Sequence, residues 1–355
     1  MTERLILLDR NENHFGPAPA CFEVLRQASI GDLSLYSRDY ERRVKSKLSE
    51  RLARTLGVPE NRILLSYGSE DMLKQAVHSS LDPGEKILIP SLSWWYYKAV
   101  ASEVDGVTVE YPVHERGESF FYDVQEIIEK VRRERPRIVL LASPNNPTGH
   151  SVSNDDLHRL LSESGETILI LDEAYRGFSI EQRDELPSLL SRYNNLLILR
   201  TFSKFYALAG IRIGYACAGK SLYRLAKFSA RYLGYNLLSE KLALAALDSA
   251  DYYDQIRNKM IEERANYVRE LSALTGWKPY RSDANFLLVR TPEGVKTSLK
   301  RWLEKKGIAI KFFDEGPLNN CVRITVGTQE QNRLLINALK EFARMQLCAQ
   351  PVKSQ

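Results

Sequence analysis

The stretch I-V-L-L-A-S-P-N-N-P-T-G, residues 138–149, is the most informative part of the sequence for predicting the architecture. Its five leading apolar residues predict a buried strand, and the Pro, Asn and Gly residues after them predict a turn. The turn would then lie at the carboxyl end of a strand, which is the edge where α/β sheets bind ligands. An ordinary connecting turn explains this segment equally well when it is taken alone, because Asn, Pro and Gly are common turn residues.

Two later segments place charged side chains at the ends of predicted strands. Residues 168–171, I-L-I-L, run into D-E-A-Y, so Asp172 follows four apolar residues. A carboxylate there is costly to bury unless a cation meets it, although an aspartate can instead cap a helix. Residues 196–200 lead to T-F-S-K, which ends at Lys204, and Arg212 follows eight residues later. Hydroxyls and cations at neighbouring strand ends favour an anion pocket, although each basic residue alone is also a normal surface charge.

Around these segments, apolar runs of strand length alternate with helical patterns along most of the chain. Such alternation is typical of an α/β domain in which helices cover both faces of a mostly parallel sheet. We therefore predict the α/β fold class. The predicted strands are 63–65, 86–90, 107–111, 138–142, 167–171, 196–200 and 211–217, and the helices among them are 40–56, 70–80, 94–104 and 124–133.

The pattern of elements divides the chain into parts. We expect a turn-rich N-terminal arm over 1–35 and a large α/β domain over 36–238. A helical pattern over 239–274 predicts a long linking helix, and it begins a segment, 239–346, that ends in a smaller α+β domain. Residues 347–355 would form a tail. The elements predicted after the linking helix are strands 285–289, 308–312 and 322–326 and helices 295–305 and 329–345.

Composition excludes several classes of protein. The 355 residues are 44% hydrophobic and 27% charged, which is typical of a folded protein and not of a disordered or fibrous one. The net charge of +5 is spread along the chain and does not favour a nucleic-acid-binding face. Four widely spaced cysteines predict neither a metal site nor disulfides. Apolar runs are too short for a signal peptide or a membrane span, so we expect a cytoplasmic protein without membrane attachment.

The segments around Gly149, Asp172 and Lys204, in this order and all at strand ends, resemble the fold type I pyridoxal-phosphate (PLP) enzymes of the aspartate aminotransferase superfamily. The resemblance implies PLP as cofactor and a large PLP-binding domain beside a smaller one. It implies that Lys204 forms the Schiff base and moves the proton, and that Asp172 meets the pyridine nitrogen. It further implies that Asn146 and Tyr175 bind the 3-hydroxyl oxygen of PLP.

More cofactor contacts follow from the same resemblance. In the family, an arginine eight residues after the lysine, nearby hydroxyls and a helix N-terminus bind the phosphate. An aromatic residue, usually tyrosine, stacks on the cofactor ring, and Trp95 occupies that position here. A core aromatic is the alternative interpretation of Trp95. The implied phosphate-binding residues are Ser69, Glu70, Thr201, Ser203 and Arg212.

The N-terminal arm most closely resembles that of histidinol-phosphate aminotransferase. L-D-R-N-E-N-H-F-G-P, residues 8–17, matches its arm motif and places Phe15 near the substrate. L-Y-S-R-D, residues 35–39, matches a segment whose tyrosine, here Tyr36, reaches the cofactor phosphate of the other subunit. The resemblance therefore implies a homodimer with shared active sites.

The substrate end of the predicted site departs from that pattern. V-R-I-T-V-G-T, residues 322–328, matches the segment whose arginine, here Arg323, binds the substrate carboxylate. Lys311 stands where the subfamily has an arginine associated with the substrate phosphate, and His14 and Ser37 replace prolines. The cofactor and reaction class are therefore predicted more firmly than the substrate. The implied substrate-binding residues are Phe15, Asn146, Lys311 and Arg323.

The predicted activity is the transfer of an amino group between an L-amino acid or histidinol phosphate and a 2-oxo acid such as 2-oxoglutarate. Three alternatives remain open from the sequence. The same scaffold could act on another amino acid, for example an aromatic one, or could decarboxylate a phosphorylated amino acid. A ligand-binding regulator that has lost turnover is the alternative from a different class. We expect small-molecule substrates, no bound metal, and neither nucleic acid nor membrane as a partner.

Overall fold

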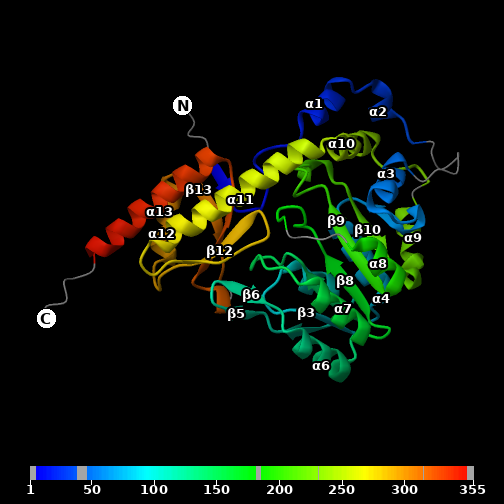
Figure 1. Ribbon diagram of the computed structural model, residues 1–355, viewed down its shortest axis with the longest axis horizontal. Coiled ribbons are helices and arrows are strands. Elements are labelled where there is room, and N and C mark those ends of the chain that lie inside the picture. The colour runs from blue at the N-terminus through cyan, green and yellow to red at the C-terminus, as the bar shows by residue number, and fades with distance from the viewer. Residues whose placement is uncertain (1–4, 38–45, 181–184, 231, 315, 350–355) are drawn as a thin grey trace.

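The computed structural model describes residues 5–37, 46–180, 185–230, 232–314 and 316–349, and it contains two main sheets (Figure 1). The larger sheet has seven strands in the order β2-β10-β9-β8-β7-β3-β4. Strand β10 is antiparallel to both neighbours, whereas the β9-β8-β7-β3-β4 series is parallel throughout. This confirms the predicted α/β class. The strands are β2 (Ile63–Ser66), β3 (Lys86–Pro90), β4 (Val107–Tyr111), β7 (Ile138–Ala142), β8 (Ile168–Asp172), β9 (Leu196–Thr201) and β10 (Gly214–Ala218).

Helices bury both faces of the seven-stranded sheet. Every residue of β7 and β8 is buried, and alternate residues belong to two separate core clusters. Leu140 and Ile170 pack in the cluster that contains Met72 of α4, whereas Val139 and Leu169 pack in the other cluster. Successive side chains of a strand point to opposite faces of the sheet, and here both faces are buried. The strands are therefore continuous apolar runs in the sequence. The surrounding helices are α4 (Ser69–Ser80), α5 (Tyr96–Ser102), α6 (Val124–Glu134), α7 (Asn154–Glu163), α8 (Leu186–Arg192) and α9 (Ala226–Ser229).

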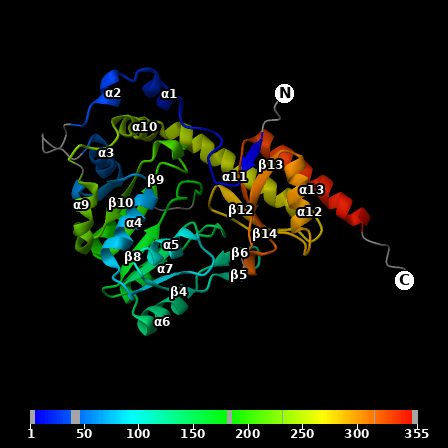
Figure 2. The same ribbon diagram turned by 180° about the vertical axis from the view of Figure 1, so that it is seen from behind.

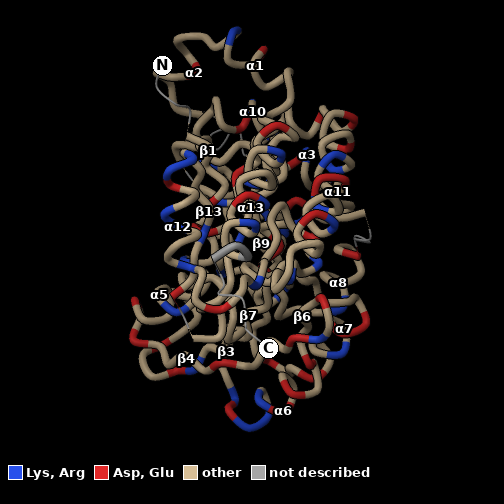
Figure 3. The backbone as a smooth tube through the Cα atoms, turned by 90° about the vertical axis from the view of Figure 1, so that its left-hand side faces the viewer, with Lys and Arg blue, Asp and Glu red and all other residues tan. Residues whose placement is uncertain are grey.

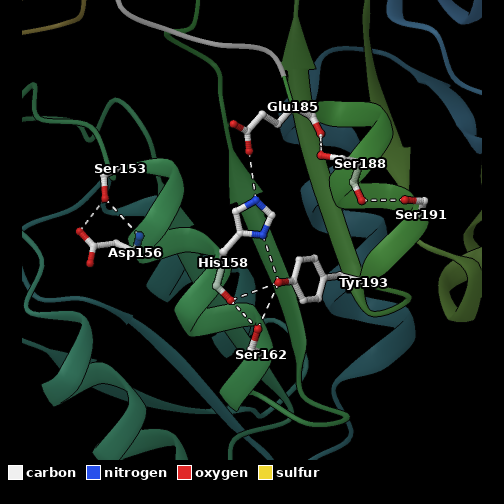
Figure 4. A network of polar contacts seen from close by, with 8 residues as sticks. All are labelled: Ser153, Asp156, His158, Ser162, Glu185, Ser188, Ser191 and Tyr193. Atoms are coloured by element: carbon white, nitrogen blue, oxygen red, sulfur yellow. Dashed lines mark hydrogen bonds and ion pairs between the residues drawn. The ribbon is translucent and has the colours of Figure 1, made fainter.

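A polar network joins α7 to α8 at the surface of this part (Figure 4). His158 Nδ1 lies 3.0 Å from the Tyr193 hydroxyl, and His158 Nε2 lies 3.0 Å from a carboxylate oxygen of Glu185. The Tyr193 hydroxyl is also 3.1 Å from Ser162 Oγ, which donates to the carbonyl of His158 on its own helix. None of these residues lines the main cavity. The network therefore ties two helices together at a distance from the candidate site.

The second sheet brings together both ends of the chain. Its order is β1-β13-β14-β12-β11, and β1 pairs in parallel with β13. Helices α11, α12 and α13 lie beside this sheet (Figures 1 and 2). The elements are β1 (Ile6–Leu8), β11 (Lys278–Pro279), β12 (Phe286–Arg290), β13 (Ile308–Phe312), β14 (Cys321–Thr325), α12 (Lys296–Lys305) and α13 (Gln329–Ala349), and a separate hairpin is formed by β5 (His114–Arg116) and β6 (Ser119–Phe121).

The N-terminal segment contains more regular structure than the predicted arm. Besides β1, it forms α1 (Pro19–Arg26) and α2 (Ile30–Ser34), which pack against α10 (Leu237–Leu247). Tyr253 fixes the start of α1, because its hydroxyl accepts from the Ala18 N–H at 3.1 Å. The many turn residues thus separate short packed elements rather than marking a continuous extended segment.

Two predicted helices differ from the observed ones. The stretch predicted as one helix over 239–274 is two helices, α10 and α11 (Ala250–Ser272), separated at Asp248 and Ser249. Ser249 leaves the helical conformation, with φ −109° and ψ 41°, and its side chain donates to the Ala245 carbonyl at 2.8 Å. Helix α3 (Lys47–Leu56) starts after the cap Ser46 and ends at Gly57, as predicted for its C-terminus. The beginning of the predicted helix 40–56 lies outside the described residues.

The charges of the described residues are mixed over the surface. Lys and Arg alternate with Asp and Glu along the outer helices (Figure 3). Among the described residues, none of the helices combines the length and apolarity needed to cross a bilayer. Four short 3-10 segments complete the described structure: η1 (Glu60–Arg62), η2 (Ala209–Ile211), η3 (Lys220–Leu225) and η4 (Gly316–Leu318).

A close backbone approach at Gly219 yields a stability prediction. A Cβ atom at Gly219 would lie 2.3 Å from the Asn194 carbonyl oxygen, which cannot move without shifting the adjoining strand. We expect Gly219→Ala to lower the free energy of unfolding by about 1–3 kcal/mol, because overpacking a closed site strains the backbone. Urea denaturation measures the change. Gly210→Ala is the matched control, since its Cβ would meet nothing within 4 Å, and an equal loss in both variants would contradict the steric explanation.

Candidate active site

The main cavity lies between the two sheets and has a volume of about 560 Å³. The carboxyl ends of β7, β8 and β9 form one wall, and β13 and β14 of the smaller sheet contribute to the other. Most of the side chains predicted from the sequence meet here. Those that line the cavity are Ser69, Glu70, Trp95, Asn146, Asp172, Tyr175, Thr201, Ser203, Lys204, Arg212, Lys311 and Arg323.

Asp172 is the last residue of β8, and its carboxylate is buried in the cavity wall. The Tyr97 hydroxyl donates to Oδ2 at 2.8 Å, and the Ala174 N–H donates to Oδ1 at 3.0 Å. Burial raises the pKa of the Asp172 carboxyl, and these two hydrogen bonds oppose that rise. Both donors are neutral, so the described residues hold Asp172 by hydrogen bonds without placing a cation against it. The site can therefore accept a positively charged ligand group.

Lys204 follows the end of β9 by three residues, and its amine lies in the cavity. Nζ donates to the Arg10 carbonyl at 3.1 Å and lies 5.7 Å from the centre of the Tyr175 ring. Within the described part of the chain, no carboxylate lies within ion-pair distance of this amine. An amine held in this way by a carbonyl remains available to a ligand.

An anion-binding corner forms where α4 begins. Ser69 is the first residue of α4, so the N–H groups of its first turn face outward from the positive end of the helix dipole. Arg212 adopts a left-handed conformation with φ 53°, and its Nη1 donates to Ser203 Oγ at 3.4 Å. Thr201 Oγ1 lies 3.0 Å from the same hydroxyl. Glycine is favoured at position 68, because its φ of +94° is a conformation that L side chains rarely adopt.

Glu70 and Trp95 line the cavity from more exposed positions. Glu70 Oε2 lies 3.8 Å from Arg212 Nη2, with both side chains about half exposed. Trp95 immediately precedes α5 and is 66% exposed, so its ring is accessible to a ligand rather than packed in the core. The core-aromatic interpretation of Trp95 is therefore wrong.

A second polar group links the turn after β7 to the smaller sheet. Asn146 Nδ2 donates to the Tyr175 hydroxyl at 3.4 Å, and Arg323 Nη1 donates to Asn146 Oδ1. Arg323 Nη2 donates to the Asp9 carbonyl at 2.7 Å. Burial lowers the pKa of Arg323, although an arginine guanidinium remains charged in proteins. The predicted residues Asn146, Tyr175 and Arg323 thus lie in one connected group.

Two predicted site residues lie outside the cavity of this chain. Phe15 packs against the hydrophobic core, and its carbonyl accepts from the Tyr252 hydroxyl at 3.1 Å. Phe15 is not part of the cavity lining, so the prediction that it meets the substrate gains no support from its position. Tyr36 is 70% exposed and does not line this cavity.

Two side chains that hydrogen-bond to predicted site residues were not identified from the sequence. Tyr97 donates to Asp172, and Asn11 Nδ2 donates to the Tyr175 hydroxyl at 2.9 Å. Asn11 is buried with φ 54°, a conformation that asparagine tolerates better than most residues. Helical spacing could have identified Tyr97, because Tyr97, Val100 and Ala101 share the buried face of α5.

Comparison with known proteins agrees with this geometry. The family model for aminotransferase class I and II matches residues 3–339. The chain belongs to this aminotransferase family. The histidinol-phosphate aminotransferase of Ruminiclostridium cellulolyticum is 33% identical over 340 residues, covering 94% of this aminotransferase and 91% of the relative. The histidinol-phosphate aminotransferase of Roseiflexus castenholzii is 34% identical over 345 residues, covering 96% and 90%, respectively.

A solved structure extends the comparison to the fold and cofactor. The histidinol-phosphate aminotransferase of Sinorhizobium meliloti, in complex with pyridoxal-5′-phosphate, matches with a TM-score of 0.85 and 28% identity. The match covers 96% of this aminotransferase and 91% of that chain. The fold type I assignment and PLP as cofactor are thereby confirmed.

The cavity of the aminotransferase fits PLP group by group. Asp172 lacks a positive partner among the described residues and suits a protonated ring nitrogen, whereas the corner around Ser69 and Arg212 suits a phosphate. Lys204 offers an amine without a carboxylate partner there. Among the described residues, no group of three or more His, Cys, Asp or Glu side chains could hold a metal ion.

Asp172 provides the prediction that separates a cofactor contact from a helix cap. In the cofactor-free protein at pH 8, Asp172→Asn should unfold at a temperature no lower than wild type. The reason is linkage between folding and ionisation. A carboxyl group whose pKa is raised by folding makes the folded protein less stable as the pH rises through that pKa. Asparagine does not ionise, so the variant avoids this loss. PLP affinity should fall at least about tenfold, since one pKa unit is about 1.4 kcal/mol.

Thermal unfolding and PLP titration measure these two effects. Asp156→Asn removes an equal charge from α7, outside the cavity, and serves as the control. Unchanged PLP affinity in Asp172→Asn would mean that Asp172 only supports the local turn.

Proposed function

We propose that the aminotransferase transfers the amino group of histidinol phosphate to a 2-oxo acid such as 2-oxoglutarate. The observation that carries this proposal is a pair of cations on the smaller sheet. Lys311 of β13 is directly opposite Arg323 of β14 in an antiparallel pair, and both residues line the cavity. Side chains opposite each other in such a pair lie on the same face, and like charges there are destabilising. An anionic substrate group would relieve this repulsion.

The hydrogen bonds of Arg323 support the same conclusion. Its two terminal nitrogens donate to neutral oxygens, those of the Asn146 side chain and the Asp9 carbonyl. Within the described residues, Arg323 Nε is buried and has no hydrogen-bond partner. A buried guanidinium bound by neutral groups is costly without an anion. A carboxylate or phosphate can accept from a guanidinium through two oxygens at once.

Both half-reactions of this transamination involve anions. Histidinol phosphate carries a phosphate, and the amino acid formed from 2-oxoglutarate carries carboxylates. Lys311 and Arg323 can therefore serve both substrates in turn from the same wall. The named activity of the relatives, together with this wall, favours histidinol phosphate over an aromatic amino acid, which carries no phosphate.

The residues of the larger sheet perform complementary tasks. Bound PLP supplies an electron sink for negative charge at the substrate α-carbon. Asp172 holds a proton on the ring nitrogen by its opposite charge, and the Lys204 amine removes and returns the α-carbon proton. Asn146 and Tyr175 hold the 3-oxygen of the ring, and the corner around Arg212 anchors the phosphate. Trp95 covers one face of the ring, which limits the access of water.

Lys311 gives the test of the substrate. Lys311→Ala should raise the KM for histidinol phosphate about tenfold, because one charge-assisted contact is lost, and should leave the KM for unphosphorylated histidinol unchanged. Lys311→Arg should retain or improve the KM for histidinol phosphate, since a guanidinium can bind phosphate with two parallel hydrogen bonds. Steady-state kinetics with both donors measures these values.

Lys306→Ala is the matched control, because Lys306, at the C-terminal end of α12, pairs with Glu341 of α13 and does not line the cavity. An unchanged ranking of donors in Lys311→Ala would contradict the assignment of the substrate. Release of carbon dioxide from a phosphorylated amino acid, without amino transfer, would instead indicate the decarboxylase alternative.

We further propose that the enzyme is a homodimer in which Tyr36 completes the phosphate corner of the partner subunit. Tyr36 does not line the cavity of its own chain. Ile30, Leu33, Leu35 and Tyr36 are each more than 60% exposed on one short segment. Contiguous exposed apolar side chains of this kind favour a protein interface. A second copy of the chain would cover them.

Subunit mixing tests the shared sites. Lys204→Ala and Tyr36→Ala subunits should each be inactive, and a mixture that has exchanged subunits should regain activity. At equal proportions of the two subunits, about half of the dimers are mixed, and each mixed dimer has one intact site of two. The recovered activity should therefore approach about one quarter of that of the wild type. The measurement is transaminase activity after dissociation and reassociation.

The control mixes Lys204→Ala with Asp172→Asn, because both residues belong to the same cavity of one chain and every mixed dimer lacks an intact site. Equal activity gains in both mixtures, or a fully active monomer, would contradict the shared-site dimer.

We also propose a cytoplasmic location. Cys21, Cys217 and Cys321 are buried, and none of the three forms a disulfide within the described residues. Cysteines outside disulfides are typical of proteins in reducing compartments. Fractionation of cells that express the protein would test the location.

A further inference from the structure

Tyr97 connects the hydrophobic core to the candidate active site. Its ring is 3% exposed and packs in the core cluster that contains Leu140 and Ile170. Its hydroxyl reaches Asp172 Oδ2 at 2.8 Å and is part of the cavity lining. Strand β7 lies between β3, which precedes α5, and β8, so the side chain spans a neighbouring strand to reach Asp172. The ring therefore has a fixed position and the hydroxyl a fixed target.

The surrounding contacts hold the Tyr97 side chain in this position. The Tyr97 N–H donates to the Trp94 carbonyl at 3.1 Å, and the Trp94 and Tyr97 rings meet edge to face with centres 5.7 Å apart. Val100 and Ala101, on the same face of α5, are fully buried. Because core packing restricts the ring, little conformational entropy is lost when the hydroxyl binds the carboxylate.

The other groups near Asp172 do not replace this hydrogen bond. Glu173, next in the chain, adds negative charge that disfavours a second ionised carboxyl. Tyr122 packs nearby, but its hydroxyl donates to the Ala142 carbonyl at 2.8 Å. The Tyr175 hydroxyl accepts from Asn11 and Asn146. Asp172 therefore accepts one hydrogen bond from the backbone, donated by the Ala174 N–H, and one from a side chain, donated by the Tyr97 hydroxyl.

We propose that Tyr97 is a positioning residue that orients the Asp172 carboxylate and favours its ionised form toward the ring nitrogen of the cofactor. This proposal rests on the proposed role of Asp172. A hydrogen bond from a neutral hydroxyl stabilises a carboxylate more than a carboxylic acid, so it opposes the effect of burial. Two of the lone-pair positions of the carboxylate are then used by Tyr97 and Ala174, which leaves others for the ligand.

The first test uses cofactor-free protein. Tyr97→Phe should lose stability in a pH-dependent manner, with a loss that grows as the pH rises through the raised pKa of Asp172, because the missing hydrogen bond matters most when Asp172 is ionised. The equilibrium constant for unfolding above that pKa should rise by about tenfold, the usual effect of a hydrogen bond to a charged group. Urea denaturation at pH values below and above that pKa gives the values.

Tyr111→Phe is the matched control for this test. Tyr111 is also fully buried in the larger sheet, and its hydroxyl donates to the Leu140 carbonyl at 2.9 Å rather than to an ionisable group. Its stability loss should not change with pH. Equal pH dependence in the two variants would overturn the proposal, and this outcome does not depend on whether PLP is the ligand.

The second test uses the holoenzyme. Tyr97→Phe should weaken PLP binding by about tenfold and shift the pH midpoint of the absorption of bound PLP, while the KM for the amino donor changes little. In an Asp172→Asn background, Tyr97→Phe should have almost no further effect on PLP affinity, because the two residues act as one unit. Titration of PLP into the wild type, the two single variants and the double variant measures the coupling between Tyr97 and Asp172.

The outcomes separate this inference from the proposed function. Additive losses in the cycle would overturn the positioning role of Tyr97 and leave the aminotransferase assignment intact. Failure of the wild type to bind PLP would overturn the role of Asp172 at the cofactor and with it the proposed consequence of Tyr97. A raised KM for the amino donors with an unchanged PLP spectrum would overturn the proposal, because it would mean that Tyr97 acts on the substrate instead.

Discussion

Two buried charges of opposite sign face one cavity, and neither has an ionic partner among the described residues. Asp172 at the end of β8 is held by Tyr97 and Ala174, and Arg323 on β14 is held by Asn146 and the Asp9 carbonyl. Burying a charge with neutral partners alone is costly. In the proposed function two different ligands complete these charges: the cationic ring of the cofactor meets Asp172, and an anionic group of the substrate meets Arg323. The two sheets serve to keep these charges on opposite walls.

The N-terminal segment holds the two walls together. Strand β1 pairs with β13, and the next residues cross to the larger sheet. Asn11 donates to Tyr175 on one side, and its own N–H donates to Thr325 Oγ1 at 2.9 Å on the other. Its left-handed backbone is strained for a residue other than glycine, and such strain concentrates at functional sites. The segment is therefore part of the site rather than an appendage.

The sequence predicts the cofactor wall well because its residues directly follow apolar strands. Asp172, Thr201 and Lys204 come within three residues of a strand end, so one-dimensional patterns locate them. Tyr97 and Asn11 reach the site from a helix face and from a distant segment, and only tertiary packing decides such contacts. The break at Ser249 was missed for a similar reason, since serine competes for a helix carbonyl without ending the apolar pattern.

The two walls differ in how freely they can change. On the cofactor wall, the positive φ of Gly68 and the helix N-terminus that follows it constrain the backbone, so substitutions there disturb several groups at once. On the substrate wall, Lys311 is an exposed side chain on β13, and replacing it alters charge and reach without moving the strand. Donor specificity can therefore change by single side chains while the cofactor chemistry is conserved. The lysine at this position, where the family resemblance implies an arginine, is the kind of difference that this division allows.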